Sequence, residues 1–89
     1  MQVQFLYGSK IKNREQLHEQ LAQIFRFPAH YGNNLDALWD CLGDVSAPFQ
    51  LIISEQDVLA DNLGDYCGRF LRVLGDAEAE NPNLHIEYR

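Results

Sequence analysis

Three short segments with the character of β-strands, separated by helical segments, constrain the fold of this chain most. They span residues 2–7, 49–53 and 84–88. The first and last alternate apolar and polar residues, whereas the middle one is almost continuously apolar, as in a strand covered on both faces. Strands joined through helices usually run parallel. The sequence therefore predicts an α/β fold with a three-stranded parallel sheet packed with about four helices, and it leaves the strand order open.

Three of the predicted helices are delimited by residues that cap or break helices. Ser, Asp and Asn favour helix N-termini, whereas Gly and Pro favour the ends. The first helix also carries a capping-box pattern, because Gln16 follows Asn13 by three residues. The three helices are bounded by Asn13 and Pro28, by Ser54 and Gly64, and by Asp65 and residues 81–83.

The fourth helix is short and central. Asn34 is a suitable N-cap and Gly43 a suitable C-cap. Between them the apolar residues recur at the i, i+3, i+4, i+7 spacing of one helical face, beginning at Leu35. Trp39 falls at the edge of this face. The pattern predicts that this large aromatic side chain lies half in the core.

Two aspartates follow Trp39 around this helix. Asp36 and Asp40 are one turn apart, and like charges at that spacing cost about 0.2–0.5 kcal/mol on an exposed helix. Asp40 also lies toward the helix C-terminus, where the helix dipole opposes a negative charge. Residues that local rules disfavour are candidates for a function. An isolated Asp would be read as a solvated polar position, but beside Trp39 the pair indicates a binding face.

The charge distribution indicates a basic partner. The net charge is −6, and seven carboxylates but no Lys or Arg lie between Arg26 and Arg69. A negative field of this kind repels nucleic acid and membrane phosphates and attracts a basic protein surface. Acidity that serves only solubility is the alternative.

Length and composition exclude several classes of protein. Eighty-nine residues with 46% hydrophobic content predict one domain over residues 1–89. No apolar run is long enough to span a membrane, and no secretory signal is visible. Two isolated cysteines, Cys41 and Cys67, are too few for a disulfide framework or a zinc site. These features predict a soluble, reduced, cytoplasmic domain that binds no metal, cofactor, nucleic acid or membrane and is a monomer when free.

Catalysis is the weaker interpretation. Asp36 and Asp40 with His30 resemble an acid–base set, but an exposed carboxylate pair has no means of separating its pKa values. No phosphate-binding loop or metal-binding motif is present. The remaining histidines, His18 and His85, are predicted to be surface or boundary residues. The chain is therefore not expected to be an enzyme.

Residues 31–42, which contain one Trp and two Asp, closely resemble the central motif of the barstar family. The resemblance also covers the opening strand, the first helix, the last helix and the final strand. Members of this family are small intracellular inhibitors of guanyl-specific ribonucleases of the barnase type. The resemblance implies a barstar-like fold and a partner that is a basic, barnase-like extracellular-type ribonuclease or a related toxin.

The resemblance also assigns roles to individual residues. Asp40 would place its carboxylate where the RNA phosphate normally binds, and Asp36 would meet a neighbouring basic group. Trp39 would extend the contact, and Asp76 would be an outlying acidic residue. The implied partner-binding set comprises His30, Tyr31, Asn34, Leu35, Asp36, Trp39, Asp40, Gly43, Asp44 and Asp76.

Three departures from the family pattern fall on the same expected contact face. His30 replaces the first residue of an aromatic doublet, residues 43–47 are one residue shorter and lack a Trp, and Asp76 replaces a Glu. They suggest a different cognate ribonuclease or altered specificity. An acidic binding module for a basic partner that is not a ribonuclease is the alternative function.

Overall fold

The computed structural model describes residues 1–89 and confirms the predicted α/β fold, with a three-stranded parallel sheet and four α-helices. A short 3-10 helix follows the first strand. The elements are β1 (Gln2–Tyr7), η1 (Gly8–Lys10), α1 (Arg14–Phe25), α2 (Leu35–Gly43), β2 (Phe49–Ser54), α3 (Gln56–Leu63), α4 (Asp65–Glu80) and β3 (Leu84–Tyr88).

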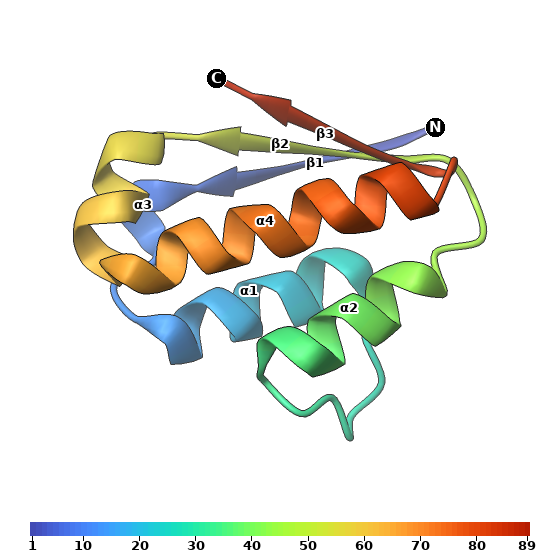
Figure 1. The fold of residues 1–89 in the computed structure, drawn as a ribbon, viewed down its shortest axis with the longest axis horizontal. Helices are drawn as coiled ribbons and strands as arrows, with labels where there is room; N and C mark the ends of the chain where they lie inside the picture. Colours follow the sequence, from blue (N-terminus) through green and yellow to red (C-terminus); the bar gives the residue numbers. More distant parts are fainter.

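The strand order, which the sequence left open, is β1-β2-β3. Both neighbours run parallel to β2, with Leu51 opposite Gln4 on one side and Ile86 on the other. Figure 1 shows α1, α2 and α4 on one side of the sheet and α3 at the end where β2 finishes. Helices cover only one face of the sheet, so the expectation that the middle strand is covered on both faces is wrong. Four of the six residues of β2 are nevertheless buried, because the strand lies between two neighbours.

Two leucines fix α2 in the core. Leu38 and Leu42 have no exposed surface and belong to the same hydrophobic cluster as Phe70 and Leu74 of α4. Figure 1 shows α2 beneath α4, on the side away from the sheet. The apolar stripe of α2 therefore faces the domain, and its opposite side faces solvent.

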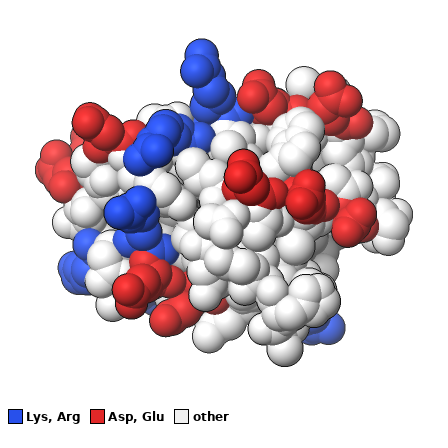
Figure 2. Space-filling model, turned by 60° about the horizontal axis from the view of Figure 1, so that its bottom comes forward, with Lys and Arg blue, Asp and Glu red and all other residues white.

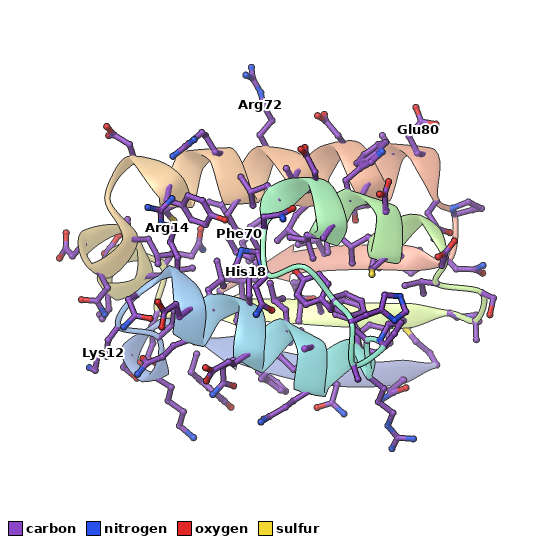
Figure 3. All side chains as sticks on the ribbon, turned by 90° about the horizontal axis from the view of Figure 1, so that it is seen from below. Lys12, Arg14, His18, Phe70, Arg72 and Glu80 are labelled. Atoms are coloured by element: carbon purple, nitrogen blue, oxygen red, sulfur yellow. The ribbon has the colours of Figure 1, made fainter.

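His18 is buried, contrary to the prediction that it lies at the surface or boundary. Its side chain is 1% exposed. Its Nδ1 lies 2.7 Å from the hydroxyl of Tyr31, and its Nε2 lies 2.8 Å from the hydroxyl of Tyr66. Figure 3 shows the ring in the space between α1 and α4. Two hydroxyl partners satisfy both ring nitrogens, so burial leaves no polar atom unpaired.

This burial predicts a pH dependence of stability. Burial, and after it the positive charge of Arg14, lower the pKa of His18 below its ordinary value of 6.5. The unfolded chain then binds a proton that the native protein does not. The free energy of unfolding is therefore expected to keep its full value above about pH 6.5 and to decrease as the pH drops below 6.5. Urea unfolding of wild type and His18→Gln between pH 5 and 8 measures this, and His18→Gln is expected to lose the slope.

A matched control is His85→Gln, because His85 is exposed on β3. This variant is expected to keep the wild-type slope. Equal slopes in wild type and His18→Gln would contradict the assignment to His18.

The predicted caps are partly wrong. Asn13 accepts a hydrogen bond from the backbone N–H of Gln16, as expected, but the side chain of Gln16 accepts from Lys12 instead of completing the box. Neither Ser54 nor Asp65 caps a helix. Glu55, in the left-handed region, precedes α3, and Gly64 separates α3 from α4. The helices begin close to the predicted residues, but the backbone makes these turns without the expected side-chain bonds.

Candidate partner-binding site

The N-terminus of α2 is held by the residue that the sequence predicted. The side-chain oxygen of Asn34 accepts a hydrogen bond of 2.8 Å from the backbone N–H of Ala37, and its amide nitrogen donates to the carbonyl of Gly32. Asn33 has a φ of 53°, a conformation that Asn tolerates better than most residues. These local bonds fix where α2 begins.

Three carboxylates form an acidic row on the exposed side of α2. Asp36, Asp40 and Asp44 follow one another at intervals of four residues, and all three are exposed. The one ion pair in the structure joins Arg89 and Glu87, so none of the three is neutralised by the protein's own basic groups. Figure 2 shows a row of acidic side chains across this face, with basic ones gathered to one side. The row is free to act on another molecule.

Trp39 borders the acidic row on the side of α4. Its side chain is 40% exposed, so part of the indole is held by the domain and part is available to a partner. A hollow of about 230 Å³ opens here between α2 and α4. We name it the α2–α4 hollow, and its lining residues are Trp39, Asp40, Gly43, Asp44, Ala77 and Glu80.

Gly43 is the last residue of α2 and not its C-cap. Asp44 occupies the cap position in a right-handed conformation, and its N–H donates to the carbonyls of Cys41 and Leu42. No left-handed residue is needed, so the expectation of a glycine cap is wrong. A Cβ at Gly43 would meet no atom within 4 Å, which leaves this edge of the hollow open.

A second hollow, of about 250 Å³, lies on the other side of α2, against the preceding loop. His30 and Tyr31 line it together with Asp40 and Asp44. His30 is exposed, whereas Tyr31 is only 8% exposed and belongs to the hydrophobic core. The hydroxyl of Tyr31 pairs with the buried histidine of α1. Tyr31, which the resemblance placed in the partner-binding set, therefore has most of its surface in the core and little available to a partner.

Cys41 lines the same hollow but is not a reactive thiol. Burial raises its pKa first, and the negative charges of Asp44 and Asp40 raise it further. The thiol therefore stays protonated at neutral pH and behaves as a small, half-buried apolar group.

The outlying acidic residue of the predicted set does not line either hollow. Asp76 is exposed on α4, whereas Glu80, one turn further along the same helix, lines the α2–α4 hollow with Trp39 and Asp40. The sequence analysis missed Glu80. The i, i+4 spacing of Asp76 and Glu80 on one helix was the signal that could have pointed to it.

Asn81 is a second residue that the sequence analysis did not single out, and it secures the end of α2. Its side chain is buried, and its amide nitrogen donates to the carbonyls of Leu42 and Val45 at 2.9 and 3.0 Å. Its oxygen accepts from the N–H of Asn83. A single side chain at the end of α4 thus ties down the C-terminus of α2 and the connection to β2.

Replacing Asn81 by Ala is expected to lower the free energy of unfolding by about 1–2 kcal/mol. The loss stays moderate because the carbonyl of Leu42 also accepts from the N–H of Val45, and that of Val45 also accepts from Asn83. Asn81→Asp is expected to cost more, because a carboxylate would face two carbonyl oxygens. Urea unfolding at pH 7 measures both variants, and an Asp variant as stable as wild type would contradict these bonds.

Two further features bear on the kind of site. No group of three or more His, Cys, Asp or Glu side chains is arranged to hold a metal ion. None of the helices has both the length and the apolar character needed to cross a membrane.

The fold and the site together define a small α/β domain that presents an acidic, unneutralised helix flanked by two shallow hollows. The family model described as "Barstar (barnase inhibitor)" matches residues 1–89, and the chain belongs to the barstar family. A relative from Bacillus subtilis (strain 168), named "Putative ribonuclease inhibitor YrdF", is 40% identical over 74 residues. The match covers 82% of this chain and 81% of the relative.

Proposed function

We propose that this protein inhibits a guanyl-specific ribonuclease of the barnase type by inserting α2 into the cationic active site of the enzyme. The single observation that carries the proposal is the acidic row of Asp36, Asp40 and Asp44, which is exposed and has no ion-pair partner within the protein. Family membership and the name of the Bacillus relative support inhibition of a ribonuclease in general. The assignment to a barnase-type enzyme and to insertion of α2 rests on the charge and shape of the α2 surface.

The mechanism follows from the chemistry of the target. A ribonuclease must bind a polyanion, so its active site carries basic groups that are desolvated when substrate is bound. A carboxylate on a rigid helix offers those groups the same charge without a bond that can be cleaved. Asp40 would occupy the phosphate position and Asp36 a neighbouring one. Since Asp40 borders both hollows, basic side chains of the enzyme could approach it from either side.

The neighbouring residues would supply area and position. The exposed part of Trp39 would pack against the enzyme, while Asn34 and Leu35 would complete the contact at the start of α2. His30 and Gly43 would meet the rim, and Asp44 and Asp76 would extend the negative field. Tyr31 would act mainly through the loop that it anchors. Binding, and not catalysis, is therefore the proposed activity.

The test is an inhibition assay with the purified protein and a barnase-type ribonuclease cleaving a short fluorescent RNA. Cleavage is expected to stop at a molar ratio near one, and the association rate is expected to fall as NaCl is raised from 50 to 500 mM, because salt screens long-range attraction. Lysozyme, a basic protein without ribonuclease activity, serves as the binding control. Full RNA cleavage at micromolar excess of inhibitor, or equal binding of lysozyme, would contradict the proposal.

A further inference from the structure

A third hollow, next to the N-terminus of α2, contains two arginines and is not explained by phosphate mimicry. Its volume is about 560 Å³, and it opens between the starts of α1, α2 and α4. We name it the arginine hollow. Among its lining residues are Arg14, Asn34, Leu35, Asp36, Tyr66 and Arg69. Three of these also belong to the partner-binding set, so a protein that covers α2 would cover this hollow as well.

One aromatic ring organises both arginines. The guanidinium carbons of Arg14 and Arg69 lie 4.9 and 5.2 Å from the centre of the Tyr66 ring. Tyr66 is itself fixed, because it is only 8% exposed and its hydroxyl is paired with the buried His18. Stacking on a rigid ring restricts the long arginine side chains and lowers the entropy lost when they bind a ligand. Figure 3 shows Arg14 on the side of α1 that faces α4.

Neither arginine has a counterion. Glu15 and Asp36 line the same hollow, yet no carboxylate lies within ion-pair distance of Arg14 or Arg69. Two positive charges gathered on one ring repel one another, and no carboxylate of the protein is close enough to pair with either of them. An anion placed between them would remove this repulsion and could accept hydrogen bonds from both guanidinium groups.

We propose that the arginine hollow receives the carboxylate of a single Asp or Glu side chain from the protein partner that binds α2. This inference rests on the proposed function and adds a second charge requirement to it. The partner must be basic opposite Asp36 and Asp40, and it must carry an acidic side chain opposite Arg14 and Arg69. A planar carboxylate matches the forked donors of guanidinium groups.

A protein carboxylate fits the hollow better than a nucleic acid does. RNA brings a phosphate at every nucleotide, and a strand that reached Arg14 and Arg69 would also approach the acidic row of α2, which begins at this hollow. Asp36 lines the hollow itself. A single carboxylate has one charge and can enter without bringing others, so its attraction to the arginines is not offset along the row.

The arginine hollow would then act in the choice of partner. A ribonuclease with an acidic residue at this point of its rim gains two charge-assisted bonds, whereas one with Lys or Arg there meets like charges. The acidic row would recognise ribonucleases as a class, and the arginine hollow would distinguish among them.

The first test does not depend on any ribonuclease. The protein is titrated with citrate, as the carboxylate probe, at constant ionic strength, and the Nε–Hε NMR signals of Arg14 and Arg69 are followed. Both signals are expected to shift together and to saturate. The double variant Arg14→Gln/Arg69→Gln lacks both signals, and the other residues that line the hollow are expected to show no citrate-dependent shifts in it. Arg72→Gln is the matched control, because Arg72 is on α4 but points away from the hollow. No saturable shift, or tighter binding of inorganic phosphate or of a ten-nucleotide RNA than of citrate, would overturn the proposal.

The second test uses the inhibited ribonuclease. The double variant is expected to raise Kd by roughly 10- to 100-fold, whereas Arg72→Gln changes it by less than about threefold. Acidic residues on the rim of the enzyme are then changed to amides one at a time. One of these changes is expected to weaken binding to wild type but not to the double variant. If no enzyme carboxylate shows this coupling in a complex that forms, the proposal is wrong. If inhibition does not change when Asp40 is replaced, the proposed function is wrong. The citrate titration would then be the test of the arginine hollow.

Discussion

Asp40→Ala is expected to weaken inhibition of a barnase-type ribonuclease by at least about 100-fold in Kd. In the proposed complex the carboxylate is enclosed by basic groups of the enzyme. Removing one partner of an enclosed ion pair leaves the other charge desolvated and unpaired, at a cost of about 3 kcal/mol or more. A titration of ribonuclease activity against inhibitor concentration, for wild type and variant, measures the effect. Asp40→Asn, which keeps the shape, is expected to lose nearly as much.

Asp61→Ala is the matched control for this substitution. It removes the same charge from an exposed helical position, but on α3, which lies at the other end of the domain from the acidic row. Its effect on Kd is expected to stay below about threefold, because a distant exposed charge is screened. Equal losses for Asp40→Ala and Asp61→Ala would mean that only net charge matters, and would contradict the assignment of the phosphate position to Asp40.

Asp40→Ala is also expected to stabilise the free protein. Asp40 has Asp36 one turn before it and Asp44 one turn after it, and none of them is neutralised. Alanine removes this repulsion and is the better helix former, for a gain of about 0.5–1 kcal/mol in the free energy of unfolding. Opposite signs for stability and inhibition are typical of a residue retained for binding.

The hydrophobic periodicity of the sequence was sufficient to predict most of the fold. The runs that predicted strands at 49–53 and 84–88 lie in β2 and β3, and the spacing that begins at Leu35 produced α2 with Leu38 and Leu42 buried. Asn34 was predictable as a cap because its bond to the backbone is local. The exposure of Asp36 and Asp40 followed from the same helical periodicity, since they lie opposite the buried residues.

Features that depend on contacts between distant segments were not predictable. Alternation located β1, but its three alternating apolar residues Val3, Phe5 and Tyr7 are exposed, and Leu6, which breaks the alternation, is buried instead. Which face is covered depends on the side to which the helices return. His18 is buried because Tyr31 and Tyr66, far away in sequence, bring hydroxyl groups to its ring.

The same reason applies to parts of the candidate site. Asn81 bonds to carbonyls nearly forty residues earlier in the chain, so no local pattern announces it. The arginine hollow combines residues of three helices. Charge counting along the chain placed Arg14 and Arg69 outside the acidic middle segment, yet folding brings them beside its first aspartate. Sequence reasoning predicted the acidic row but not its basic neighbour.

Among the substitutions that affect the binding face, Leu38→Ala is expected to cause the largest loss of stability. Leu38 is fully buried in the middle of α2, directly before Trp39 and Asp40 in the sequence. Deleting most of a buried leucine side chain costs about 2–5 kcal/mol, because apolar contact is lost and a cavity remains. For a domain of this size a loss near 3 kcal/mol lowers Tm by roughly 10–25 °C. Thermal and urea unfolding at pH 7 measure the change.

The cavity would also loosen the packing of α2 against α4. Leu38→Ala is therefore expected to weaken inhibition by roughly tenfold at a temperature where the variant is still folded. Leu59→Ala is the matched control, because Leu59 is equally buried but belongs to α3. It is expected to lose similar stability and to keep its Kd within about threefold. Leu38→Ala removes no charge and no exposed surface, so a selective loss of inhibition would show that the carboxylates must be held rigidly. If both leucine variants inhibit as well as wild type, the position of α2 does not limit binding, and the acidic row would act only through its long-range field.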